Sequence, residues 1–413
     1  MDREWATRGR ERLAVRVALV QPSDLGPGER SKQVLVLTAA LRRLGHEAVA
    51  LSPVVHGTED LAEPASMSDL CDPSAWRRRG VDGVVAVTWL HQAAVLRAAR
   101  EAGLPTIALA DSDGKVVPWR HPRNLVLRAA GTARHAAAVR MSVVPAPAGG
   151  RVGTPPAVTT SPPGPDPSRL GLRARIDFGA RVRAAVAVAD WTGVSGRPAL
   201  DDYRATLQRL GIAIAPGRIG ISEQAAAPHF VGAPLDGPRQ REVLAIGRWY
   251  AAQKDPLLLR ATLRELLAHD PEVRVTIVGP GAGQVIPRHA RVEALDAVPN
   301  AELPELLTRA AVLLSTSRWE GGSATVFSEA VTCGCPVVGP SLNAVAHAAG
   351  GGHGSVMVAG RSPARLAAAA LRVVDAWDDA AGRRLAAAWR PRLDPLVVAA
   401  DLAARLSSPT APG

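Results

Sequence analysis

The sequence is poor in cysteine and in the aromatic residues that stack on nucleic-acid bases. Only three cysteines, two tyrosines and three phenylalanines occur among its 413 residues. Three cysteines do not provide a disulfide framework, and Cys333 and Cys335 stand too close together for a usual zinc-binding pair. We therefore expect buried, reduced thiols and a cytoplasmic location.

Long apolar runs are also missing. No stretch of about 18 uncharged apolar residues occurs, so we expect no membrane span. The segment before Val15 is charged and does not resemble a signal peptide. With 413 residues, of which 47% are hydrophobic and 21% charged, the chain is typical of a soluble globular protein of two domains or a little more.

Lysine is scarce as well, because the net charge of +11 comes almost entirely from arginine. Lysine occurs only at Lys32, Lys115 and Lys254. The arginine excess is typical of a GC-rich coding sequence, but it would also attract anionic partners such as nucleotide sugars or phospholipid head groups. Attraction to head groups would permit peripheral membrane association. Nucleic acid is not expected as a partner, because no basic block is interleaved with aromatic residues.

Short valine-rich strands alternate with helical segments along the chain, which predicts βαβ units and parallel sheets. In the first half we expect strands at 15–20, 48–51, 84–87, 106–110, 139–144 and 184–189, and helices at 31–44, 92–102 and 124–137. In the second half we expect strands at 243–247, 274–278, 311–315, 336–339 and 355–358, and helices at 256–268, 301–309, 323–333 and 363–377.

Two proline-rich segments divide the chain. Residues 145–167 cannot form a helix or a central strand, and we interpret them as a loop within the first domain. Residues 228–238 indicate the linker. We therefore expect an N-terminal domain at 1–230, which would bind the acceptor, and a C-terminal donor-binding domain at 231–390. A C-terminal helix and tail at 391–413 could cross back to the first domain. Doubly wound domains bind ligands at the carboxyl ends of their strands.

A motif at one expected strand end brings two cations together. The strand at 243–247 ends in Gly247, Arg248 follows it directly, and Lys254 precedes a helix that begins at Pro256. Two fixed cations at a strand end suit a diphosphate, which arginine can bind in a bidentate way. A pair of solvated surface charges is the alternative interpretation of this motif.

A second motif runs from a strand through two glycines into a helix. It contains Glu320, Gly321, Gly322, Ser323 and Glu329. The free N–H groups at a helix start form an anion site, and glycines let a phosphate approach the backbone closely. Carboxylates accept hydrogen bonds from sugar and ribose hydroxyls. A capped helix with two ordinary acids is the alternative.

The region from Val243 to Val358 resembles the donor-binding domain of the retaining glycosyltransferases of family 4, which have the GT-B fold. Its motifs follow the family's order. They are Gly247-Arg248 with Lys254; Val278-Gly279-Pro280-Gly281; Val298-Pro299-Asn300 with Leu303 to Leu307; Ser317 to Gly322; and Glu329-Ala330 with Cys333 to Val338. The first half resembles the family more loosely, through residues 15–20, 26–28 and 44–47.

This resemblance implies an α/β chain of GT-B architecture, with two facing Rossmann-like doubly wound domains. It implies that Arg248 and Lys254 stabilise the diphosphate leaving group, that Glu329 holds the ribose and that Glu320 contacts the donor sugar. The expected donor-binding set is completed by Gly28, Gly247, Gly321, Gly322 and Ser323.

Two features depart from the family. Eight residues separate Glu320 from Glu329, one more than is usual, and we assign the family's register to Glu329 because its neighbours match. Many members carry a histidine at a strand end of the first domain, where this chain has Asp111. Asp111 and His91 are therefore the candidate catalytic groups of that domain. Asp111 and Asp113 also resemble a metal-binding pair, but they lie in the wrong domain for a donor site, so we predict no metal.

The sequence thus predicts transfer of a sugar from a nucleoside diphosphate donor to a hydroxyl or amine, with retention and without a metal or cofactor. The acceptor could be a glycan, a lipid precursor or a small metabolite. A GT-B relative with other chemistry, such as a nucleotide-sugar epimerase or a phosphorylase, is one alternative. A non-catalytic donor-binding subunit is the other.

Overall fold

A computed structural model describes residues 14–21, 29–55, 60–87, 92–110, 186–209, 213–285, 289–318, 320, 324–350 and 353–407. The elements expected at 124–137 and 139–144 and the loop at 145–167 lie outside this range. Two compact units form, one from 1–109, 184–193 and 395–413 and the other from 110–183 and 194–394. Within the described residues, no helix is both long and apolar enough to cross a membrane.

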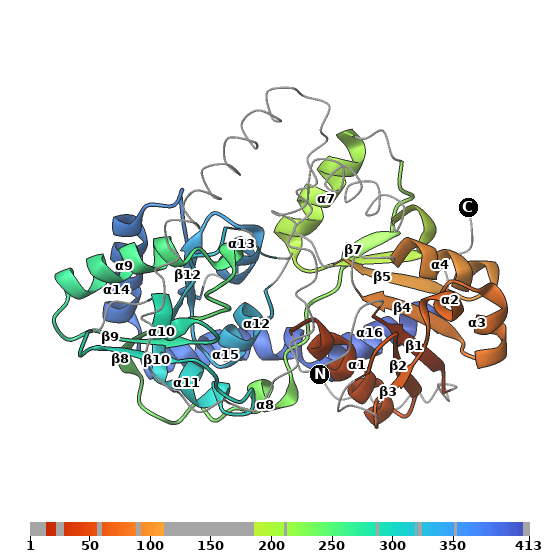
Figure 1. Ribbon diagram of the computed structural model, residues 1–413, viewed down its shortest axis with the longest axis horizontal. Coiled ribbons are helices and arrows are strands. Elements are labelled where there is room, and N and C mark those ends of the chain that lie inside the picture. The colour runs from red at the N-terminus through yellow and green to blue at the C-terminus, as the bar shows by residue number, and fades with distance from the viewer. Residues whose placement is uncertain are drawn as a thin grey trace, which may run out of the picture. The chain divides into compact units, whose positions relative to one another are not determined.

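The first sheet has seven strands in the order β3-β2-β1-β4-β5-β6-β7 (Figure 1). Its strands are β1 (Arg16–Val20), β2 (Glu47–Ser52), β3 (Ala62–Pro64), β4 (Gly83–Val87), β5 (Thr106–Ala110), β6 (Trp191–Val194) and β7 (Ile219–Ile221). The described helices of this part of the chain are α1 (Glu29–Arg43), α2 (Met67–Leu70), α3 (Pro73–Arg79), α4 (Gln92–Glu101) and α7 (Arg197–Arg209). Pairing is parallel from β3 through β5. Helix α7 and strand β7 are grouped with the second compact unit.

The second sheet has six parallel strands in the order β10-β9-β8-β11-β12-β13. They are β8 (Gln240–Ile246), β9 (Arg274–Val278), β10 (Val292–Leu295), β11 (Ala310–Leu314), β12 (Val337–Pro340) and β13 (Val356–Val358). Counted from β8, this is the 3-2-1-4-5-6 order of the doubly wound dinucleotide-binding fold, whose ligands bind where the strand order reverses. In this sheet the reversal falls between β8 and β11.

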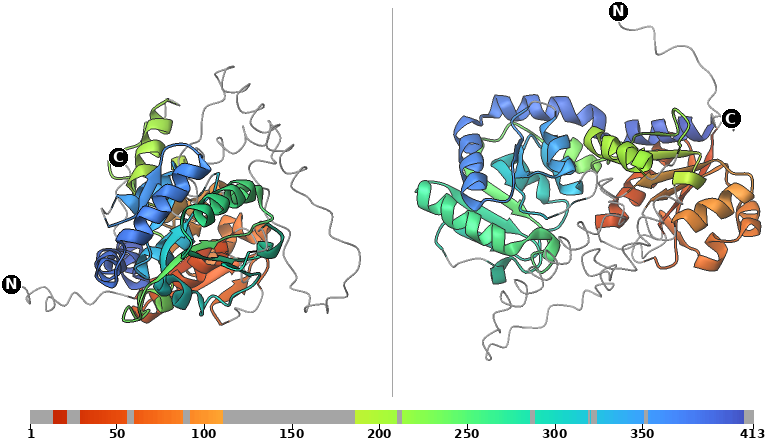
Figure 2. Two further views of the ribbon diagram at one scale, coloured as in Figure 1. Left: turned by 90° about the vertical axis from the view of Figure 1, so that its left-hand side faces the viewer. Right: turned by 90° about the horizontal axis from the view of Figure 1, so that it is seen from above.

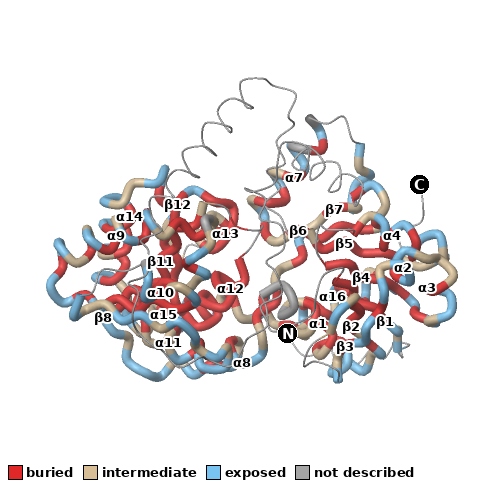
Figure 3. The backbone as a smooth tube through the Cα atoms, viewed as in Figure 1, coloured by how far each residue is buried: buried red, intermediate tan, exposed pale blue. Residues whose placement is uncertain are grey.

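Helices cover both faces of the six-stranded sheet (Figures 1 and 2). The helices of this part of the chain are α8 (Pro228–Val231), α9 (Pro256–His269), α10 (Ala282–Val285), α11 (Leu303–Arg309), α12 (Thr325–Thr332), α13 (Asn343–Ala349), α14 (Pro363–Ala376) and α15 (Asp379–Leu393). Successive side chains of β8 point to opposite faces of the sheet and pack into two separate hydrophobic clusters. Leu244 packs with α11, α12 and α15, whereas Val243 and Ala245 pack with α9 and α14. The inner strands β8, β9, β11 and β12 are accordingly buried over most of their length, whereas the edge strands β10 and β13 are more exposed (Figure 3).

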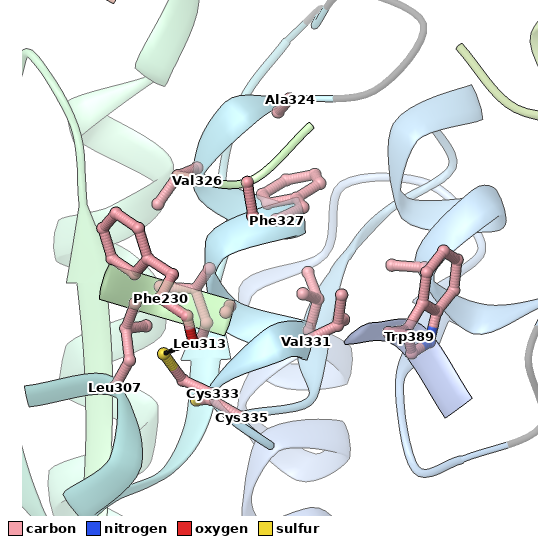
Figure 4. Packing of buried hydrophobic residues seen from close by; sticks show 14 of the residues in the cluster. Phe230, Leu307, Leu313, Ala324, Val326, Phe327, Val331, Cys333, Cys335 and Trp389 are labelled. Atoms are coloured by element: carbon pink, nitrogen blue, oxygen red, sulfur yellow. Dashed lines mark hydrogen bonds between the residues drawn. The ribbon is translucent and has the colours of Figure 1, made fainter. Parts of the chain in front are cut away.

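Helix α12 is buried along its whole length, in contrast to the other helices. Its apolar side chains lie in one cluster with Phe230, Leu313 and Trp389 (Figure 4). Cys333 and Cys335 end the same segment and are fully buried, so the predicted buried thiols are confirmed. Burial raises the pKa of the Cys335 thiol to about 12 and raises that of Cys333 as well.

The C-terminal helix α16 (Pro395–Ser407) follows α15 after Asp394 and packs against α1 in the first unit. The Arg405 guanidinium stacks 3.9 Å above the ring centroid of Trp191. Helix α15 runs through residue 390, at which the sequence analysis placed a domain boundary.

One expected strand is wrong. Residues 186–188 are helical, and the strand β6 begins at Trp191 instead of within 184–189. A short run of alanine and valine has no periodicity that separates a strand from a buried helical turn. The Asp190 carboxylate accepts hydrogen bonds from the amide and hydroxyl of Thr106, which fixes the start of β6 beside β5.

The carboxyl ends of β8 and β9 meet through two glycines. Gly279 has φ +116°, and a Cβ atom there would lie 2.1 Å from the Gly247 carbonyl oxygen. Gly247 in turn donates its amide to Val278 O at 3.0 Å. A side chain at Gly279 would therefore push the two strand ends apart.

We predict that Gly279→Ala lowers the free energy of unfolding by at least about 2 kcal/mol, because both the conformation and the contact exclude a Cβ atom. Gly283→Ala is the matched control, since that glycine lies in α10 with no atom near its added Cβ. Urea unfolding would measure both variants. Equal midpoints for the two would contradict the close approach of β8 and β9.

Candidate functional site

A small hollow lies at the reversal point of the six-stranded sheet. It is lined by Ile246, Trp249, Lys254, Leu313, Leu314, Ser315, Thr316, Ser317, Val326 and Phe327. These residues come from the carboxyl ends of β8 and β11, the loops that follow them, and the start of α12. The position is the one where a doubly wound sheet binds its ligand.

The loop after β8 carries Gly247, Arg248 and Lys254. Buried Trp249 anchors it, since its amide donates to Pro280 O at 2.9 Å and its indole to Val278 O at 3.0 Å. Arg248 is exposed, and its side chain makes no hydrogen bond or ion pair within the described part of the chain, while its carbonyl accepts from the Ala251 amide. A Cβ atom at Gly247 would come within 3.2 Å of the Lys254 side chain. The bare glycine therefore leaves room for the lysine.

Lys254 and Glu320 form a buried ion pair, with Nζ 2.6 Å from Oε1 and side-chain exposures of only 7% and 5%. Ser317 Oγ donates to the same carboxylate oxygen at 2.5 Å, and Gln253 Nε2 donates to the other at 3.2 Å. A lysine ammonium donates through up to three N–H groups, and the short contact with Glu320 directs one of them at that carboxylate. The pair keeps a cation fixed in a largely apolar hollow.

Backbone contacts tie the Lys254 turn to the segment that precedes Glu320. Thr316 Oγ1 donates to Lys254 O at 2.7 Å, and the amide of Arg318 donates to Gln253 O at 2.7 Å. From the sequence, no role was assigned to Gln253, Thr316 or Ser317, although Ser317 begins one of the family motifs. Polarity within or beside the motifs was the available signal, but it does not distinguish these residues from ordinary loop residues.

Helix α12 begins at Thr325, and its N-cap residue Ala324 makes no side-chain capping bond. At the other end, the guanidinium of Arg239 donates to Cys333 O at 2.7 Å and that of Arg390 to Thr332 O at 2.9 Å. Cations at a helix C-terminus complement its dipole. The orientation of α12 directs its positive end toward the hollow, as an anion site requires.

The structure brings together three of the predicted residues, namely Gly247, Lys254 and Glu320, with Arg248 on the same loop. Glu329 lies within α12, where it is buried to 3% exposure. The remaining predicted residues lie outside the described residues; they are Gly28, His91, Asp111, Gly321, Gly322 and Ser323.

Among the residues that the structure describes, no group of three His, Cys, Asp or Glu side chains is placed to hold a metal ion.

Comparison with known proteins now places this site in a family context. Residues 240–376, which contain the six-stranded sheet and α14, match the protein family described as "Glycosyl transferases group 1". The chain is a glycosyltransferase. A search of curated protein sequences gave no match.

Solved structures show the same fold for this glycosyltransferase. HepE from Anabaena in complex with UDP-glucose aligns with a TM-score of 0.62 at 13% identity, covering 95% of this chain and 100% of that one. WaaG, a glycosyltransferase involved in lipopolysaccharide biosynthesis, aligns with 0.58 at 14% identity, over 95% and 99%. The sucrose-phosphate synthase from Thermosynechococcus elongatus aligns with 0.58 at 15% identity, over 95% and 98%. The expected GT-B fold, with two parallel-sheet α/β domains, is confirmed.

The Lys254–Glu320 pair can be tested in this glycosyltransferase by a double-mutant cycle. Lys254→Met and Glu320→Gln should each lower the free energy of unfolding by about 3–5 kcal/mol, because each leaves one buried polar partner uncompensated. The double variant should cost clearly less than the sum. Urea unfolding of the four proteins gives the coupling energy.

The surface pair of Arg405 with Asp401 provides the control for this cycle, because its side chains are 35% and 47% exposed. Its coupling energy should be at most about 0.5 kcal/mol. Coupling of Lys254 with Glu320 no larger than this would show that the two side chains are not held together in solution.

Proposed function

We propose that this glycosyltransferase takes its sugar from a nucleoside diphosphate donor, binds the diphosphate at the Lys254 hollow and transfers the sugar to a hydroxyl or amine with retention. The supporting observation is a buried lysine at the sheet's reversal point, beside an exposed arginine that the described residues leave unpaired. HepE was crystallised with UDP and with UDP-glucose, so uridine diphosphate sugars are the first donors to test.

Stabilisation of the leaving group is the central chemical step of this proposal. As the bond between the anomeric carbon and the diphosphate oxygen breaks, the sugar acquires oxocarbenium character and the diphosphate gains charge. Arg248 and Lys254, with the positive end of α12, would stabilise that charge without a metal ion. Fixed hydrogen-bond donors stabilise charge most strongly where water is excluded, and the Lys254 side chain is only 7% exposed.

The two glutamates would bind hydroxyl groups of the donor. We assign the ribose to Glu329 and the donor sugar to Glu320. The contact of Glu320 with Lys254 means that any sugar bound by this carboxylate would lie directly beside the diphosphate-binding cation. In the first domain, His91 and Asp111 stay predictions for the group nearest the reacting carbon. Reaction in the cytoplasm and peripheral membrane association also stay predictions.

Two other functions remain alternatives to sugar transfer, and the extra residue between Glu320 and Glu329 motivates the second of them. An epimerase would convert a nucleotide sugar without any acceptor. A non-catalytic subunit would bind the donor and turn nothing over. Product analysis with the donor alone, beside thermal-shift screening of nucleotide sugars, distinguishes these outcomes from sugar transfer.

Arg248→Ala should reduce kcat/KM for the donor by roughly ten- to a hundredfold, since it removes a charge-assisted contact with the diphosphate. The control is Arg260→Ala, which removes another exposed arginine from α9 on the same domain. Both variants should unfold at wild-type denaturant concentrations. If Arg248→Ala kept the wild-type rate, the assignment of this loop to the diphosphate would fail.

Activity should survive chelation, because the proposed leaving-group stabilisation comes from side chains and a helix dipole. The measurement is turnover after dialysis against EDTA, compared with the same protein resupplied with Mg²⁺ or Mn²⁺. Loss of activity on chelation and its return with the ion would assign a metal to the reaction and direct attention to Asp111 and Asp113.

A further inference from the structure

Asp255, directly after Lys254, has an unusual backbone conformation. Among the residues described, it is the only one other than glycine with a positive φ, at +48°. It also caps α9, with Oδ1 accepting from the Leu258 amide at 3.3 Å. Aspartate tolerates this region better than most residues, but the conformation persists only where surrounding contacts hold it.

Two arginines hold the other carboxylate oxygen of Asp255. Arg318 Nη2 lies 3.0 Å and Arg361 Nη2 lies 2.8 Å from Oδ2, and the Asp255 side chain is 7% exposed. Burial lowers the pKa of the Arg361 guanidinium, and its hydrogen bond to Asp255 offsets part of that effect. The charge of the aspartate is thus fully compensated by partners from two separate loops.

Arg361 makes contacts on both sides of the hollow's rim. Its Nη1 donates to Ser317 O and its Nη2 to Thr316 O, both at 2.6 Å. One planar guanidinium therefore joins the turn that carries Lys254 to the segment that leads to Glu320. Arg361 comes from the loop after β13 and does not line the hollow. Any effect it has on a ligand there must pass through the residues that it holds.

We propose that Arg361 is a positioning residue for the donor site, which fixes the Lys254–Asp255 turn against residues 316–318 and so keeps Lys254 in place for the diphosphate. This inference rests on the proposed function for the identity of the ligand. The planar guanidinium of Arg361 binds three acceptors that lie in different directions, namely Asp255 Oδ2, Thr316 O and Ser317 O. A single rigid group with several N–H donors is suited to this arrangement.

Arg309 offers a matched control. Its side chain is 31% exposed, close to the 33% of Arg361, and its guanidinium pairs with a buried acid, Glu242, at 2.8 Å. It lies at the end of α11, directly before β11 begins. Arg309 is therefore at the amino end of β11, whereas the hollow is at the carboxyl end. Arg309→Ala removes a comparable buried ion pair without touching the site.

The first measurement needs no ligand. Hydrogen exchange should be faster in Arg361→Ala for the amides around Lys254 and for the Arg318 amide, which donates to Gln253 O. The second measurement is calorimetric binding of uridine diphosphate. Its dissociation constant should rise roughly tenfold in Arg361→Ala, as expected for one weakened charge-assisted contact. Arg309→Ala should change neither, although it should lower stability.

Arg361→Lys keeps the positive charge and removes the planar guanidinium, so it tests which of the two properties matters. It should bind uridine diphosphate about as weakly as Arg361→Ala; recovery of wild-type affinity would show that Arg361 acts only by its charge, which overturns the inference. Wild-type exchange and affinity in Arg361→Ala would overturn it as well, and so would equal losses in Arg309→Ala. If the wild-type protein bound no nucleoside diphosphate, the proposed function would fall, while the exchange measurement would still decide whether Arg361 holds the turn.

Discussion

The site in the six-stranded domain depends on one buried ion pair, that of Lys254 with Glu320. Removing two charges from water costs several kcal/mol for each ion, and apolar residues of similar size are often as stable or more so. Stability alone therefore does not account for the pair. The proposed function accounts for it, since it requires a cation that stays charged in the hollow: Glu320 compensates Lys254, and Ser317 donates to the same carboxylate oxygen.

The topology of the sheet makes this pair possible. Lys254 and Glu320 are 66 residues apart, and they meet because β8 and β11 are neighbours at the reversal of strand order. On the other side of β8 its neighbour is β9, and there Gly247 and Gly279 come into contact at the carboxyl ends of the two strands. A cation at this point of a doubly wound sheet lies where such folds bind phosphates. The fold thus provides the position, and the loop residues provide the charge.

The sequence predicted the elements of the second domain well where periodicity and capping agree. The strand at 274–278 and the helix start at Pro256 match the structure. Strand β10 and helices α13 and α15 were not predicted, because their small or half-exposed residues give weak periodicity. Gly247, Lys254 and Glu320 were found from local motifs. Asp255, Arg318 and Arg361 were given no role, because their roles come from contacts across 44 or more residues and from a backbone angle that no motif shows.

Arginine's abundance has a structural use in this chain beyond its net charge of +11. Partly buried guanidiniums repeatedly bind backbone carbonyls where helices and strands end: Arg239 at Cys333, Arg390 at Thr332, and Arg361 at Thr316 and Ser317. Such carbonyls lack partners within their own elements and cannot stay unbonded when buried. Arg239 and Arg390 meet this need at the negative end of α12, so the same two contacts that satisfy its last carbonyls also hold the helix with its positive end at the hollow. The bonding needs of a buried helix and the electrostatic needs of the proposed anion site are therefore met by one set of side chains.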